Sequence, residues 1–162
     1  MTISLVDTIL GGSGTDVLTL GGTGNTAIVA GVETLTGSAS NDVITLGARG
    51  ATMAVSLLET LTGGSGADSI TLTTASTMTI SGALDTVTGS SGGDQINLQA
   101  AGVSTTLSGV ETVSGGTGGD WVTLASGSQT ITSTGVETMI GGSGNDNVTL
   151  GNSGNTMIMA GV

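Results

Sequence analysis

Short apolar stretches recur along the chain, separated by glycine-rich and polar turns. In the clearest of them an apolar residue flanks a polar one on each side, as in Ile44-Thr45-Leu46. Alternation with a period of two places the apolar side chains on one face and is typical of a half-buried β-strand. This strand occurs six times. Its first apolar positions are Leu18, Ile44, Ile70, Ile96, Val122 and Val148, and its second are Leu20, Leu46, Leu72, Leu98, Leu124 and Leu150.

Two further apolar segments lie between successive copies of this strand. One alternates in the same way, as in Ala27-Ile28-Val29. In the third copy its apolar pair, Met78 and Ile80, comes one residue early, so we expect a shorter loop before it and a longer loop after it. The other segment is represented by the stretch from Val32 to Leu35. Its two apolar positions are three apart, which requires a bend that the sequence does not place.

Together the three segments form a unit of 26 residues, repeated six times without gaps. We divide the single repeat domain into units 6–31, 32–57, 58–83, 84–109, 110–135 and 136–161, with 1–5 and 162 as partial units. Three short strands cannot bury a core alone, whereas stacked units bury a continuous one. No helical periodicity survives the glycines. The sequence therefore predicts an all-β parallel β-solenoid of about six coils, with one three-strand coil per repeat.

Composition narrows the function further. The net charge of −11 makes nucleic acid a poor partner and cations natural ones. No apolar run reaches the roughly 18 residues of a membrane span, so we expect no membrane insertion. The chain lacks His, Cys, Lys and Tyr, which leaves only carboxylates as acid–base groups. Because a repeated row of carboxylates is not a catalytic cleft, we expect the protein not to be an enzyme.

All twelve carboxylates occupy two positions of the repeat. The first position ends each glycine-rich turn and comprises Asp16, Asp42, Asp68, Asp94, Asp120 and Asp146. The second begins the third strand and comprises Asp7, Glu33, Glu59, Asp85, Glu111 and Glu137. If equivalent positions stack about 4.8 Å apart, each neighbouring pair repels by roughly 0.9 kcal/mol in water and about 3.5 kcal/mol at an effective dielectric of 20. Arg49 is the single basic residue, so we expect bound cations between the coils.

The turns that carry the first column share a motif. They read GGSGTD, GSASND, GGSGAD, GSSGGD, GGTGGD and GGSGND. They resemble the RTX (repeats-in-toxin) calcium-binding repeat, G-G-x-G-x-D-x-U-x. The segment from Gly11 to Thr19 fits every fixed place, whereas the second turn has Ser38 and Ser40 where the inner glycines belong.

The resemblance implies calcium shared between stacked turns. Calcium takes six to eight oxygen ligands, and glycines let a turn point its carbonyl groups inward. The first column would then supply the charged ligands. The second column either binds further cations, accepts hydrogen bonds from turn amides or forms a solvated face.

Three functional classes remain. The first, which we prefer, is a calcium-rigidified structural solenoid of an extracellular or cell-surface protein, such as an adhesin stalk, surface layer or fibre. Its partners would be a second copy stacked end to end or neighbouring repeats of a longer chain. The second is a calcium-triggered folding and secretion module of an exported toxin or enzyme. The third, an ice- or glycan-binding face, needs two aligned columns of threonine, or of threonine and asparagine, on one flat face. The turn positions are too irregular for it: Thr15, Asn41, Ala67, Gly93, Gly119 and Asn145.

Overall fold

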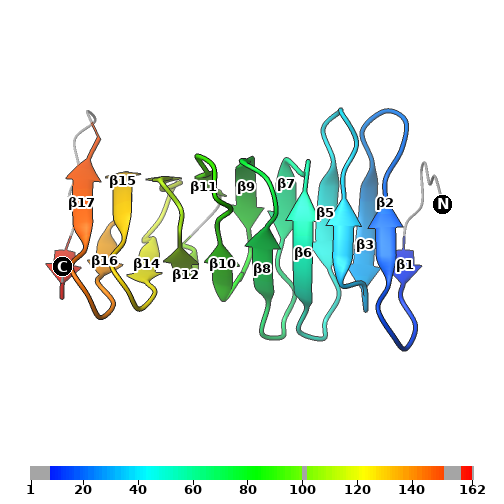
Figure 1. The fold of residues 1–162 in the computed structure, drawn as a ribbon, viewed down its shortest axis with the longest axis horizontal. Helices are drawn as coiled ribbons and strands as arrows, with labels where there is room; N and C mark the ends of the chain where they lie inside the picture. Colours follow the sequence, from blue (N-terminus) through cyan, green and yellow to red (C-terminus); the bar gives the residue numbers. More distant parts are fainter. Residues whose placement is uncertain (1–7, 100–101, 152–157, 162) are drawn as a thin grey trace.

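The computed structural model describes residues 8–99, 102–151 and 158–161, which form eighteen short β-strands arranged as a rod (Figure 1). The strands belong to two nine-stranded parallel sheets that alternate along the sequence, an odd sheet (β1 to β17) and an even sheet (β2 to β18). In these ranges no helix has the length and apolarity that a bilayer crossing needs. The predicted fold class, an all-β parallel β-solenoid, is confirmed.

The strands are three to five residues long. The odd sheet contains β1 (Thr8–Leu10), β3 (Thr26–Ala30), β5 (Val43–Leu46), β7 (Thr60–Thr62), β9 (Thr77–Ser81), β11 (Gln95–Gln99), β13 (Thr112–Ser114), β15 (Thr130–Thr134) and β17 (Asn147–Leu150). The even sheet contains β2 (Val17–Thr19), β4 (Thr34–Thr36), β6 (Thr52–Ser56), β8 (Ser69–Leu72), β10 (Thr86–Thr88), β12 (Ser104–Ser108), β14 (Trp121–Leu124), β16 (Thr138–Ile140) and β18 (Ile158–Ala160).

The number of coils differs from the prediction. Each strand pairs with the strands two before and two after it, so a coil contains two strands, one from each sheet. The expected three-strand coil and the count of six coils are therefore wrong, and the described strands make nine coils. Every turn carries the chain across to the other sheet, so two strands already complete a coil. A 26-residue unit of three strands spans one and a half coils, and equivalent residues of successive units lie in opposite sheets.

The core lies between the two sheets and consists of aliphatic side chains and methionines. Ile44, Leu61 and Ile80 stack in neighbouring odd-sheet strands and are fully buried. Burying one such side chain contributes about 1.5–3 kcal/mol. Because each coil contributes similar side chains, the core runs continuously along the rod.

The bend in the third segment lies before its strand. Gly31 has a φ of 63°, so the chain turns at residues 31–33 and β4 begins only at Thr34. Val32 therefore fills the core from the corner and Leu35 from the strand, and both are buried. In the second unit Leu57 adopts the same left-handed conformation, with a φ of 51°.

The shift in the third unit is confirmed. Met78 and Ile80 are both buried on β9. The loop before β9 spans only 73–76, and the loop after it spans 82–85, one residue longer than the corner at 31–33. Two compensating loop changes thus preserve the inward face of the strand.

Candidate calcium-binding edges

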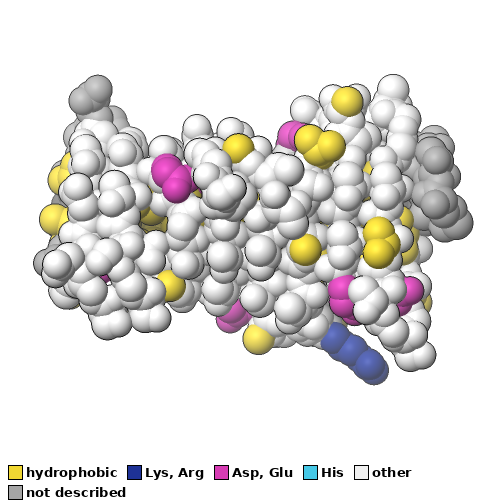
Figure 2. Space-filling view, viewed as in Figure 1, with side chains coloured by type: hydrophobic (Ala, Val, Ile, Leu, Met, Phe, Trp, Pro, Cys, Tyr) yellow, Lys and Arg dark blue, Asp and Glu magenta, His cyan; other side chains and the backbone are white. Residues whose placement is uncertain are grey.

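The residue immediately before each strand forms a ladder along each edge of the rod. The ladder that leads into the even sheet contains Asp16, Glu33, Ala51, Asp68, Asp85, Val103, Asp120 and Glu137. The ladder that leads into the odd sheet contains Asn25, Asp42, Glu59, Ser76, Asp94, Glu111, Gln129 and Asp146. Asp7 lies outside the described residues. The carboxylates accordingly lie toward the upper and lower margins of the rod (Figure 2).

Equivalent aspartates do not stack on one another. Asp16 and Asp42 lie on opposite edges, and Asp16 and Asp68 share an edge but lie three coils apart, or about 14 Å. The expected continuous row of aspartates is therefore wrong. Each of the first five aspartates is instead followed, one coil on, by a member of the second column, and one neutral residue separates such a pair from the next aspartate on the same edge. The described pairs are Asp16–Glu33, Asp42–Glu59, Asp68–Asp85, Asp94–Glu111 and Asp120–Glu137.

Each buried aspartate ties its own turn to the preceding coil. Its Oδ2 accepts a hydrogen bond from the backbone N–H four residues earlier, at 2.6–2.9 Å, as Asp42 does from Ser38. Its Oδ1 accepts one from the backbone N–H of the neutral ladder residue in the preceding coil, at 2.8–2.9 Å, as Asp42 does from Asn25. These bonds replace the water that burial removes from the carboxylate.

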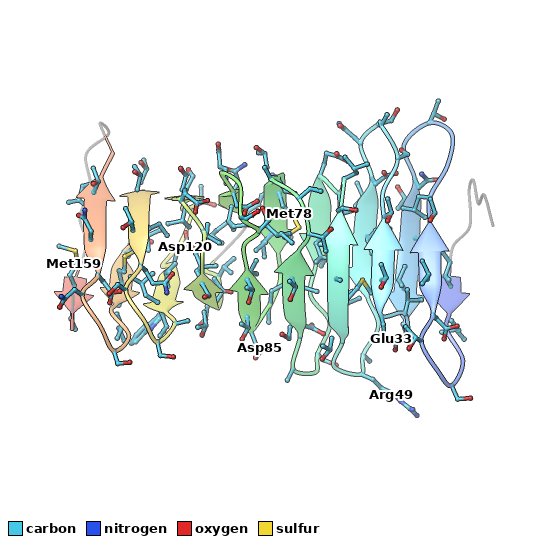
Figure 3. The ribbon with its side chains drawn as sticks, viewed as in Figure 1. Glu33, Arg49, Met78, Asp85, Asp120 and Met159 are labelled. Carbon is cyan, nitrogen blue, oxygen red and sulfur yellow. The ribbon has the colours of Figure 1, made fainter. Side chains whose placement is uncertain are left out.

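The second column ties the same aspartates to the following coil. One carboxylate oxygen of each described member accepts the aspartate's own backbone N–H, at 2.7–2.8 Å, as Glu33 does from Asp16. Of the three roles considered for this column, hydrogen bonding to turn amides is therefore present. Glu33 and Asp85 lie near the lower margin in Figure 3, where Arg49 extends away from the rod.

Desolvation and hydrogen bonding act in opposite directions on the buried carboxylate of Asp42. Asp42, Asp68, Asp94 and Asp120 are at most 1% exposed. Desolvation alone would raise the pKa of Asp42, but hydrogen bonds from the amides of Ser38 and Asn25 and from the side chain of Asn25 outweigh it. The pKa of Asp42 is lowered, so this carboxylate is charged in the folded protein at neutral pH.

The first glycine of each aspartate turn lies against a backbone carbonyl group of the next coil, which leaves no room for a side chain. This contact could not be seen in the sequence. A methyl group at Gly11 would overlap the carbonyl oxygen of Gly31 in the next coil, and one at Gly37 would overlap that of Leu57. The glycine at the fourth position of the turn serves a different purpose, because Gly14 has a φ of 118°. Gly11 is therefore required by packing between coils, and Gly14 by its backbone conformation.

The donor set suits calcium in its chemistry. The side-chain and backbone ligands that the edges offer are carboxylate, carbonyl and hydroxyl oxygens, which hard cations prefer. An ionised carboxylate has about four acceptor sites. Backbone amide bonds occupy two of those on each buried aspartate and one on Asp16 and on Asp146. Among the described residues no cluster of three or more Asp, Glu, His or Cys side chains is present. A cation on an edge would therefore rely on a pair of carboxylates together with turn carbonyls.

Comparison with known families agrees with this chemistry. The family model for the RTX calcium-binding nonapeptide repeat matches four segments, residues 6–27, 29–48, 59–72 and 131–158, which together cover just over half of the chain. No curated protein and no solved structure matches the chain. The glycine–aspartate turns, the parallel two-strand coils and this match together show that the chain belongs to the RTX calcium-binding nonapeptide repeat family.

Proposed function

We propose that this chain forms a calcium-binding structural rod in an extracellular or cell-surface protein, and that the rod has no catalytic role. The observation that carries the proposal is the regular pairing of carboxylates along both edges, with one neutral residue between successive pairs. Family membership supports calcium as the ion. The rod would serve as a stalk, a surface layer or a fibre.

The pairs give calcium a physical task. Two carboxylates one coil apart, at about 4.8 Å, repel by roughly 1–3.5 kcal/mol depending on the local dielectric. Each pair carries two negative charges, which one Ca²⁺ balances. The amide hydrogen bonds stabilise each carboxylate singly but leave this mutual repulsion in place.

We assign the ligands from these pairs. The aspartates that end the glycine turns supply the first carboxylate: Asp16, Asp42, Asp68, Asp94, Asp120 and Asp146. For the first five of these, the partner in the following coil supplies the second carboxylate, and turn carbonyl groups complete the oxygen ligands. Asp146 has no such partner among the described residues. The distinction from a calcium-triggered folding module lies in the calcium-free state, which is folded for a structural rod and unfolded for a folding trigger.

Further repeats are the partners that the rod's ends favour. Leu150 on β17 and Met159 on β18 are 44% and 45% exposed, although they pair with the buried, inward-facing Ser133 and Met139 of the preceding coil. Such apolar residues on terminal strands support the stacking of another repeat, from a second copy or from a longer chain.

A calcium titration tests the proposal at one defined pair. Trp121 directly follows Asp120, so its fluorescence reports on the Asp120–Glu137 pair. Isothermal calorimetry should show heat of calcium binding in a chelator-stripped sample, together with a change in Trp121 fluorescence. Glu137→Gln keeps the hydrogen-bond acceptor but removes the charge, so it should weaken the fluorescence response at least tenfold and leave most of the heat.

The matched control is Ser104→Ala, which alters the strand neighbour of Trp121 and no carboxylate. It should leave both signals unchanged. Absence of heat and fluorescence change in the unmodified chain, or an equal response to magnesium, would refute calcium binding at the edges.

A further inference from the structure

The outer faces of both sheets are free of charge. None of the eighteen strands contains an acidic or basic residue, because every described carboxylate and Arg49 lie in the turns. The surface between the two margins in Figure 2 is accordingly mostly uncharged. The faces therefore offer a partner hydroxyl and methyl groups rather than ion pairs.

Two columns of hydroxyl side chains run in register across the even sheet. The first column is Thr52, Ser69, Thr86, Thr106 and Thr123, on five consecutive strands from β6 to β14. The second, two residues further along the strands, is Thr71, Thr88 and Ser108, on β8, β10 and β12. Both columns were hidden in the sequence, because each draws on different positions of the repeat.

These hydroxyls are available to an outside partner. Within the described ranges no side-chain hydroxyl of the first column hydrogen-bonds to another protein group, and all five side chains are exposed or partly exposed. Elsewhere on the same sheet, by contrast, Ser56 donates to Thr36 at 3.5 Å. The first column can therefore bond fully to water.

The spacing of the columns matches a lattice of water. In ice each oxygen is tetrahedrally hydrogen-bonded, so oxygens that share a neighbour lie about 4.5 Å apart, given an O–H···O distance of about 2.75 Å. Paired strands repeat at about 4.8 Å. The mismatch of about 0.3 Å per coil grows to little more than about 1 Å over five strands. Since sheets twist, the match holds over this span rather than along the whole rod.

We propose that the even sheet from β6 to β14 is an ice-binding face. A periodic, uncharged array of hydroxyls and methyls is complementary to a periodic, uncharged surface. Solvated hydroxyls bury little apolar area, so they give no strong drive for a second copy to pack on this face. Protein partners are usually held by central aromatic and arginine anchors, and here only Trp121 stands at one end of the array.

The odd sheet provides an internal contrast. Its strand β11 presents Gln95, Asn97 and Gln99 outward, and Gln95 Nε2 donates to Asn97 Oδ1 at 3.0 Å. Bulky amides that bond to each other interrupt the hydroxyl array on that face. Ice binding should therefore depend on the even sheet alone.

The test uses the same repeat position on opposite faces. Thr86 on β10 and Thr112 on β13 are 26 residues apart, so they occupy equivalent positions but different sheets. With calcium present, the unmodified chain should show thermal hysteresis and partition into growing ice. Thr86→Tyr should lower the hysteresis at least fivefold, whereas Thr112→Tyr should leave it unchanged.

Circular dichroism checks that both variants fold. If Thr86→Tyr does not fold, Thr106→Lys replaces it, because it places a charge in the same column. No hysteresis in the folded, calcium-bound chain would overturn the proposal, as would equal losses in the Thr86 and Thr112 variants. Binding to cellulose or chitin that Thr86→Tyr abolishes, without ice activity, would assign the face to a crystalline glycan instead.

Discussion

The first and second aspartate turns, 11–16 and 37–42, match the family motif to opposite degrees. The first fits at every fixed place, yet its Asp16 carboxylate accepts one described backbone hydrogen bond, from Gly12. The second lacks both inner glycines, yet Asp42 is fully buried and accepts three N–H groups, one from Ser38 and two from Asn25. The burial of the carboxylate and the number of hydrogen bonds that it accepts therefore depend on having a neighbouring coil on each side, not on agreement with the motif.

In the second turn, a serine hydrogen bond stabilises the turn in place of the two inner glycines of the motif. Ser38 Oγ accepts the backbone N–H of Ser40 at 3.2 Å, which fixes the turn from within. Only the first glycine, Gly37, has no substitute, because the carbonyl of Leu57 lies against it. The comparison thus separates replaceable glycines from the irreplaceable one.

The largest expected effect comes from that first glycine. Gly37→Ala places a methyl group against the backbone carbonyl of Leu57, and neither backbone can retreat without breaking its coil. We expect a loss of about 3 kcal/mol or more in the free energy of unfolding, measured by urea denaturation. Gly12→Ala is the control, since no atom lies within 4 Å of the added methyl. Equal losses in the two variants would contradict the packing argument.

Removing the carboxylates themselves should reproduce the difference between the turns. Asp42→Ala leaves the buried N–H groups of Ser38 and Asn25 without acceptors, at about 1–3 kcal/mol each. Asp16→Ala leaves one, that of Gly12, so it should cost about 1 kcal/mol. Urea midpoints of the two variants measure the contrast. A larger loss for Asp16→Ala would show that motif agreement matters more than the surrounding coils.

Acid should weaken the second turn in a defined direction. The pKa of Asp42 is lowered in the folded state, so its contribution to stability is complete above the unfolded value near 3.9 and is lost as pH falls through the folded pKa. The unmodified chain should therefore lose more stability between pH 5 and pH 3 than Asp42→Asn does. Urea midpoints at both pH values provide the measurement, and parallel losses would argue against the hydrogen bonds as the cause.

The smallest expected effect is a gain at the corner of the second unit. Leu57 has a φ of 51° where Gly31, Gly109 and Gly135 occupy the equivalent place. Its side chain is 54% exposed, so little packing is lost on its removal. Leu57→Gly should stabilise the protein by about 1 kcal/mol, since the left-handed region costs a non-glycine residue about 1–2 kcal/mol. Leu57→Ala keeps the strained Cβ and should bring no such gain in the urea midpoint.

Much of this fold could be predicted because repetition fixes what every unit must do. The alternation around Thr45 predicted a strand, and the early Met78 and Ile80 predicted the two loop changes. The number of strands per coil could not be read in this way. Strand pairing depends on how sharply each turn reverses the chain, and the repeat length does not record that angle.

The same error altered the candidate site. All described carboxylates lie in the turns, but the neighbours of each differ from those expected, because a unit of one and a half coils sends Asp16 and Asp42 to opposite edges. The pairing of Asp16 with Glu33 and the role of Asn25 as a donor to Asp42 appear only when residues 17 apart are compared. A search at the spacing of one coil, rather than one repeat, would have found both.

The most direct test of the account is the thermal unfolding of the chain, followed by circular dichroism in chelator, in magnesium and in calcium at equal ionic strength. A ligand at one hundred times its Kd stabilises by about 2.7 kcal/mol per site, and about 2–4 °C accompanies each kcal/mol in a chain of this size. Calcium bound at the carboxylate pairs should raise the Tm by roughly 10 °C or more, and magnesium by much less. The same Tm in calcium and in chelator would contradict a calcium-stabilised rod.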